Sequence, residues 1–297
     1  MSTVVQKPLY RITEKQDVYK NAKVQFTRDG FCRVTCFTRK VYKGEGYEPL
    51  EYKSLEQAEQ ELLRKQKKET PQESEKRVRQ DSFKRSKNKI FEIASANEWN
   101  YMVTFTVDGD KVNRYDREAV KKAFSSWLYD MSKRKGLKAL IIPEYHKDKA
   151  IHFHGLINDS LKMVHSGTYK IEGSKSPVRL STLKKKGLTV DGDTVKDVYN
   201  VEDYKLGFST AVRLDGNATR VAFYMTKYCT KDLEKIFGSY YFCVGKINRH
   251  LPYQICNMNF ADLQELGNSV TVDLPDNLGQ VVYATITIDD FYGSEII

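Results

Sequence analysis

The stretch Tyr101-Met102-Val103-Thr104-Phe105-Thr106-Val107 decides the fold that we expect for this chain of 297 residues. Its residues alternate in character and are mostly β-branched or aromatic, which is typical of a strand within a sheet. Two more strands are predicted at Leu140–Glu144 and Ile151–Ile157, joined by the polar turn His146-Lys147-Asp148-Lys149. Strands joined by so short a turn run antiparallel. The sequence therefore predicts an α+β fold with a central antiparallel sheet.

Helices are expected to flank this sheet. The first covers roughly residues 116–134, where apolar residues recur at helical spacing. The side chains expected to face inward are Ala119, Phe124, Trp127, Leu128 and Met131. A second helix is predicted at Val221–Leu233, and a long charged stretch at 55–96 is predicted to be helical with a break near Pro71.

The ends of the chain differ from its centre. Residues 10–45 read as extended around a turn at Asp29-Gly30, and Val281–Ile288 reads as a strand. Residues 159–200 are rich in Gly, Ser and Lys and indicate an insertion or a mobile β element. We expect three consecutive parts, which are an N-terminal extension at 1–75, a central domain at 76–260 and an acidic, β-rich tail at 261–297.

The net charge of +10 is unevenly distributed. Residues 250–297 contain seven acidic residues and no Lys or Arg, so this segment carries −7 and residues 1–249 carry +17. A basic body of this size favours a polyanionic partner, because neutralised phosphates release counterions. Charge alone would fit an ordinary solvated surface equally well, so it indicates nucleic acid only together with the motifs below.

Several classes of protein are disfavoured. The five cysteines form no Cys-x-x-Cys pair, which argues against a zinc finger or a disulfide scaffold. We find neither the apolar core of a signal peptide nor an apolar run of membrane-spanning length, so we expect a soluble intracellular protein without a membrane partner. A Gly-x4-Gly-Lys-Ser/Thr motif is also missing, so no ATPase or helicase motor is expected.

A metal site is predicted at Ile151-His152-Phe153-His154-Gly155. On a strand, residues two apart point to one face, so both imidazoles would lie together while Phe153 enters the core. Glu144 closes the preceding strand and lies across a short hairpin from His152. Two imidazoles and a carboxylate suit Mg²⁺ or Mn²⁺ and would also accept Zn²⁺. A His-x-His pair alone is more often structural, and His146 and His165 are interpreted as exposed residues of polar turns.

Candidate nucleophiles occur in Tyr224-Met225-Thr226-Lys227-Tyr228-Cys229-Thr230-Lys231, which contains two overlapping Tyr-x-x-Lys units. Residues four apart share a helix face, so Tyr224 and Tyr228 would present their phenols side by side. Lys227 and Lys231 would favour a phenolate and could clamp a phosphate. Because the chain has 19 tyrosines, the pair taken alone would be unremarkable core packing.

A basic helix precedes the first motif strand. Eleven Lys or Arg residues and four acidic residues lie between Arg64 and Lys89. The candidate DNA-binding residues are Lys84, Arg85, Lys87 and Lys89. An exposed helix face with i, i+4 ion pairs explains the pattern equally well, and both interpretations stay open.

A tyrosine pair downstream of a His-x-His strand resembles the HUH endonucleases that initiate rolling-circle DNA replication, above all the two-tyrosine initiators of small single-stranded DNA phages and related plasmids or prophages. The likeness covers roughly residues 75–260, and histidines before tyrosine is the initiator order. Other segments that resemble the family are Lys84–Ala96, Asn97–Thr106, Val198–Asn200, Gly207–Thr210, Gly238–Phe242 and Leu251-Pro252. Phe105-Thr106 departs from the Thr-Phe of many members.

The resemblance implies an RRM-like sheet in residues 76–260 and a third metal ligand at Glu144. It also implies that a tyrosine attacks a phosphodiester of origin DNA and leaves a 5′-phosphotyrosine and a primer 3′-hydroxyl. The second tyrosine would cleave the regenerated origin. The expected partners are single-stranded DNA at a replication origin, a host helicase and a DNA polymerase in the cytoplasm of a bacterial host cell.

Three alternatives stay open at this stage. One is a single-strand transposase with the same chemistry, and another is a non-catalytic single-stranded DNA-binding protein, since aromatics among basic residues suit base stacking. A zinc hydrolase is disfavoured because no His-Glu-x-x-His helix is present.

Overall fold

The computed structural model describes residues 10–11, 19–43, 48–49, 71–174, 176–190, 194–216, 218–228, 235–274 and 278–293. It divides into two compact units, one of Arg79–Leu251 and one of Met1–Val78 with Pro252–Ile297. The N-terminal extension and the acidic tail, which the sequence analysis treats as separate parts, therefore contribute to one unit.

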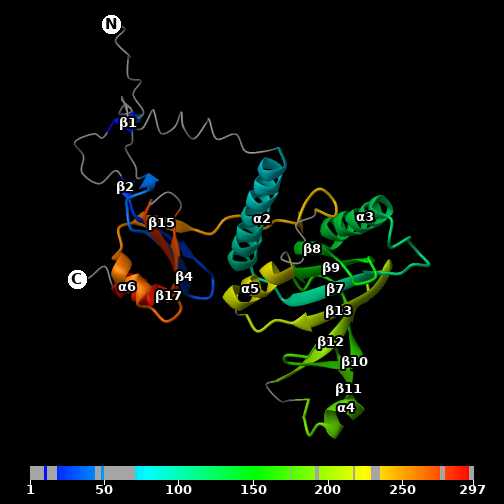
Figure 1. Ribbon diagram of the computed structural model, residues 1–297. Coiled ribbons are helices and arrows are strands. Elements are labelled where there is room, and N and C mark those ends of the chain that lie inside the picture. The colour runs from blue at the N-terminus through cyan, green and yellow to red at the C-terminus, as the bar shows by residue number, and fades with distance from the viewer. Residues whose placement is uncertain are drawn as a thin grey trace. The chain divides into compact units, whose positions relative to one another are not determined.

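The larger unit contains a sheet of eight described strands in the order β11-β10-β12-β13-β7-β9-β8-β14 (Figure 1). The strands are β7 (Tyr101–Val107), β8 (Ala139–Tyr145), β9 (Ile151–Ile157), β10 (Met163–Ile171), β11 (Val178–Arg179), β12 (Val195–Val201), β13 (Gly207–Arg213) and β14 (Phe242–Val244). Every pairing among them is antiparallel. The predicted α+β fold with a central antiparallel sheet is confirmed. Residues 159–200 extend this sheet through β10, β11 and β12, and they also carry α4 (Leu180–Lys185).

Helix α3 (Arg117–Lys135) has defined local signals at both ends. The Asp116 carboxylate accepts hydrogen bonds from the backbone N–H groups of Glu118 and Ala119 at 3.0 and 3.1 Å. Gly136 ends the helix with φ = 70°, a left-handed conformation in which a β-carbon is unfavourable. The helix predicted at roughly 116–134 is thus confirmed within a residue at each end.

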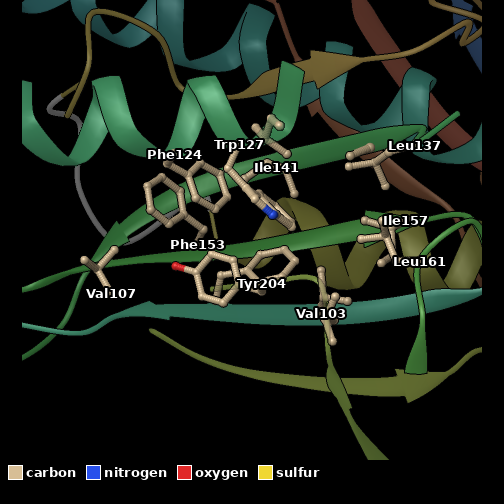
Figure 2. Close-up of a cluster of buried hydrophobic side chains, with 14 of the residues drawn as sticks. Val103, Val107, Phe124, Trp127, Leu137, Ile141, Phe153, Ile157, Leu161 and Tyr204 are labelled. Carbon is tan, nitrogen blue, oxygen red and sulfur yellow. The ribbon is translucent and has the colours of Figure 1, made fainter. Parts of the chain in front are cut away.

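The face of the sheet covered by α3 is apolar (Figure 2). Phe153 of β9 stacks on Phe124 of α3 with ring centroids 3.6 Å apart. Trp127 also faces the sheet, and its indole N–H donates to the Asp203 carbonyl at 3.0 Å. Odd-numbered residues of β7 and β9 fill this core because successive side chains of a strand point to opposite faces.

The opposite face is covered by α2 (Pro71–Ala96) and α5 (Ala218–Tyr228) (Figure 1). Helix α2 begins at Pro71, where the sequence predicts a break. The apolar contacts on this face come from Ile90, Phe91, Ile93 and Ala94 of α2, Val221, Ala222 and Met225 of α5, and Leu140, Ile142 and Leu156 of the sheet. Farther along the same strands the even-numbered residues become polar, and the candidate site begins there.

The other unit contains a sheet of five described strands in the order β15-β3-β4-β17-β16. They are β3 (Ala22–Phe26), β4 (Phe31–Phe37), β15 (Tyr253–Cys256), β16 (Val270–Asp273) and β17 (Gln280–Thr287). β3 and β4 form a hairpin at the predicted Asp29-Gly30 turn, where Gly30 has φ = 83°. The remaining described elements are the strand pairs β1 (Tyr10–Arg11) with β6 (Glu48–Pro49) and β2 (Tyr19–Lys20) with β5 (Tyr42–Lys43), and helices α6 (Phe260–Gln264) and α7 (Ile288–Gly293).

Candidate active site

Strand register brings the predicted metal ligands to one face of the sheet. Glu144 of β8 pairs with His152 of β9, as the hairpin predicts, and His154 lies two residues farther along β9. The β8–β9 turn is closed by a hydrogen bond from the His146 N–H to the Ala150 carbonyl at 2.8 Å. His152, His154 and Glu144 therefore share a face, while the intervening Phe153 is buried in the core.

The Glu144 carboxylate contacts His154 rather than the histidine directly opposite. Its Oε2 atom lies 3.2 Å from His154 Nε2, and both side chains are largely buried. A carboxylate at this distance favours the protonated imidazole and holds the ring in position. The two side chains thus form one polar unit in the middle of an otherwise apolar sheet.

Two threonines that the sequence analysis did not select hold the histidine rings. Thr104 Oγ1 lies 3.1 Å from His154 Nδ1, and Thr106 Oγ1 lies 3.2 Å from His152 Nδ1. These contacts follow from register, because Thr104 pairs with His154 and Thr106 with His152. With Nδ1 engaged, Nε2 is the nitrogen that each ring directs toward a ligand. The polar positions of the alternating strand Tyr101–Val107 were the signal for them.

His152 stacks on His146, a residue interpreted from sequence as an exposed turn residue. The ring centroids are 4.7 Å apart, and His146 Nδ1 lies 3.1 Å from an Asp148 carboxylate oxygen. Burial lowers the pKa of His152, and the neighbouring His146 and His154 lower it further. A neutral imidazole is the form that binds metal ions. His146 remains largely exposed but is part of this cluster.

Helix α5 places both candidate tyrosines beside the histidines. The Tyr228 ring stacks on the His154 ring with centroids 3.9 Å apart and planes 16° apart. The Tyr228 hydroxyl donates a hydrogen bond to the Tyr224 hydroxyl at 2.6 Å. The two phenols thus lie side by side, as four-residue helical spacing predicts, and Tyr224 is 40% exposed.

The environment of Tyr228 disfavours its phenolate. Burial raises the pKa of Tyr228, and so do the hydrogen bond to Tyr224 and the nearby Glu144 carboxylate. Each cause opposes a negative charge on the phenol oxygen. In this arrangement Tyr228 is a neutral donor to Tyr224.

The two predicted lysines differ in what the structure describes. Lys227 is exposed in the last turn of α5. Lys231 and the C-terminal part of the predicted helix Val221–Leu233 lie outside the described residues. The proposed role of both lysines at a phosphate stays a prediction.

The candidate DNA-binding residues of α2 do not form a uniform surface. Lys84 and Arg85 are exposed, and Lys87 is half-buried. Lys89 Nζ lies 3.1 Å from Glu92 Oε2 and 2.9 Å from His250 Nδ1, so it is engaged in an ion pair within the unit. Lys89 therefore fits the ion-pair interpretation, whereas Lys84 and Arg85 remain candidates for a phosphate contact.

The donor set fits a divalent cation in chemistry. Glu144, His152 and His154 share a face and supply one oxygen and two nitrogen donors. Glu144 and His154 contact each other directly, and Tyr228 covers the His154 ring. Over the described ranges, no group of three or more His, Cys, Asp or Glu side chains is already gathered as a metal site. The assignment of these three residues as ligands stays a prediction.

Comparison with known proteins gives one match. Residues 100–233 match a family model of replication-associated proteins of the ORF2 type, a range that includes the strands and the helix of the candidate site. The match supports a role in replication initiation. Comparisons with curated proteins and with solved structures gave no match. In the described part of the chain, no helix is both long and apolar enough to cross a membrane.

Proposed function

We propose that this chain initiates rolling-circle replication by nicking and rejoining single-stranded DNA at an origin through a 5′-phosphotyrosine. The observation that carries the proposal is the stack of Tyr228 on His154, with the Tyr228 hydroxyl hydrogen-bonded to that of Tyr224. The predicted nucleophiles and the predicted metal ligands come from distant parts of the sequence and meet at one place. The match to a replication-associated family over residues 100–233 supports the same function.

The reaction needs one nucleophile and one leaving group. The Tyr224 oxygen attacks phosphorus and loses its proton, a P–O bond forms, the bond from phosphorus to the 3′-oxygen breaks, and the 3′-oxygen takes up a proton. A divalent cation held by Glu144, His152 and His154 would supply Lewis-acid polarisation of the phosphoryl oxygens. Thr104 and Thr106 orient the histidines, and Tyr228 positions the Tyr224 hydroxyl.

Two adjacent phenols suit two successive cleavages. When one tyrosine carries DNA, the second can cleave the regenerated origin, and the free 3′-hydroxyl then attacks the first phosphotyrosine to close a circle. The phosphotyrosine conserves the energy of the broken phosphodiester, so no ATP is needed for these steps. We expect a host helicase and polymerase to supply unwinding and synthesis in the bacterial cytoplasm.

Trapping a covalent protein–DNA adduct tests this proposal. The chain is incubated with single-stranded DNA of its own element and Mg²⁺ or Mn²⁺, and adducts are resolved on a denaturing gel. We expect an adduct with the parent and some with Tyr224→Phe and Tyr228→Phe separately, but none with the double variant. Tyr129→Phe is the matched control, because Tyr129 is an exposed tyrosine on α3 at the opposite face.

The outcomes separate the alternatives. Binding of DNA without any adduct would favour the non-catalytic binding protein. Adducts that insert the strand into a second DNA instead of priming synthesis would favour a transposase. An adduct on one tyrosine only, with circle closure unaffected by loss of the other, would leave a one-tyrosine enzyme.

A further inference from the structure

The most exposed large apolar side chain in the described residues is Phe208, at 70%. A single exposed aromatic on a protein surface needs no special explanation. The position of Phe208 does need one, because β13 is a central strand and not an edge strand. Its odd-numbered neighbours, Ser209 and Ala211, are buried against the α3 side.

Register places Phe208 in line with the candidate site. Phe208 pairs with Thr106, Thr106 pairs with His152, and His152 pairs with Glu144. Residues directly opposite in antiparallel strands have their side chains on the same face. The four side chains therefore form one row across β13, β7, β9 and β8, on the face that carries His154 and the tyrosines.

A glycine fixes this register. A β-carbon at Gly207 would overlap the backbone of Thr106 and Asp108, so no larger residue fits there without a shift of the strand. β13 thus approaches β7 very closely at the residue before Phe208. The close approach holds Phe208 opposite Thr106 and makes the exposed ring part of a rigid surface.

The surface around Phe208 suits a nucleic acid strand. Thr210, two residues farther along β13, is exposed on the same face. Lys205 lies just before β13, and Lys111 Nζ donates to the Lys205 carbonyl at 3.1 Å, so two ammonium side chains flank this end of the strands. An aromatic platform beside basic groups is the combination that binds single-stranded nucleic acid through stacking and phosphate contacts.

We propose that Phe208 stacks on a base of the single-stranded DNA substrate, so that the bound strand crosses from β9 over β7 to β13. The identity of the strand rests on the proposed function. Phe208 lies two strands from His152, about 10 Å across the sheet. At about 3.4 Å for each stacked nucleotide, the contacted base lies within about three nucleotides of the scissile phosphate.

Binding of a fluorescent oligo-dT of about 16 nucleotides, followed by anisotropy without metal, tests the stack. Phe208→Ala should weaken binding about 5- to 150-fold, and Phe208→Trp should retain it. The slope of affinity against salt should stay at the parent value, because a phenyl ring neutralises no phosphate. Tyr129→Ala is the matched control, since Tyr129 is 60% exposed on α3 and should bind like the parent.

A second measurement uses the unaltered chain. Photocrosslinking to an oligonucleotide that contains halogenated deoxyuridine should modify the peptide that contains Phe208. Parental affinity in a folded Phe208→Ala variant, or crosslinks only on other peptides, would overturn the inference.

The two proposals fail in different ways. Phe208-dependent binding by a chain that never forms an adduct would overturn the nicking function and keep the stack. Normal adduct formation with parental binding by Phe208→Ala would overturn the stack alone. A parent chain that does not bind the oligonucleotide at all would overturn both.

Discussion

The two faces of the eight-stranded sheet are made by the same strands but differ in what they do. Toward α3, the odd-numbered residues of β7 and β9 pack an apolar core that includes the Phe153–Phe124 stack. On the other face, even-numbered residues one position away form the polar cluster around His154. Alternation along a strand therefore separates stability from chemistry at single-residue resolution, and substitutions on the two faces should have opposite signatures.

The largest expected effect is the loss of cleavage when the polar face is altered. His154→Ala removes the ring that contacts Glu144, Thr104 and Tyr228. We expect adduct formation to fall by at least about a thousandfold. The free energy of unfolding should fall by no more than about 1–2 kcal/mol, because the apolar core on the α3 side is left intact.

Quenched-flow adduct assays and urea denaturation measure these two quantities. His165→Ala is the matched control, since His165 lies on β10 beside Asp197 at 3.3 Å and away from the cluster. Parental cleavage in a folded His154→Ala protein would remove this histidine from the active site.

On the apolar face we expect the reverse signature. Phe153→Ala leaves a cavity beside Phe124 and should lower the free energy of unfolding by about 3–5 kcal/mol. Phe153→Leu retains most of the volume and should lower it by clearly less. Urea denaturation of the two variants checks this, and a loss below about 1 kcal/mol for Phe153→Ala would mean that the aromatic stack is not packed as described.

A smaller effect is expected at Gly155, which follows His154 on β9 and faces the apolar core. A β-carbon there would meet the end of the Ile141 side chain and would lie 3.0 Å from the Leu140 carbonyl oxygen. Gly155→Ala should therefore lower the free energy of unfolding by about 1–3 kcal/mol. Gly109→Ala is the control, because a β-carbon at Gly109 meets no atom within 4 Å. Equal stability of the two variants would show that β8 can shift to accept the methyl group.

The smallest effect concerns the orientation of a ligand. Thr104→Val keeps the shape of the side chain and removes the hydroxyl beside His154 Nδ1. We expect the Mn²⁺ concentration for half-maximal cleavage to rise about tenfold, with little change in stability. Thr210→Val is the control, because Thr210 pairs with Thr104 in register and is exposed. An unchanged Mn²⁺ titration would assign Thr104 to packing alone.

The sequence by itself determined the parts that depend on local pattern. Alternation in Tyr101–Val107 and Ile151–Ile157 predicted β7 and β9 residue for residue, since period-two patterning is a property of consecutive residues. The hairpin turn predicted the pairing of Glu144 with His152, and four-residue spacing predicted that Tyr224 and Tyr228 lie side by side. These inferences need only the geometry of one strand, one turn or one helix.

Tertiary structure decided the contacts between segments that are far apart in sequence. No local pattern shows that β7 pairs with β9 so that Thr104 and Thr106 hold the histidine rings, or that Tyr228 stacks on His154. The same holds for strands from the two ends of the chain in one sheet, and for Phe208 on the row of His152. Such contacts depend on strand order and register, which the packing of whole faces selects, because a slip of one residue would move every side chain to the opposite face.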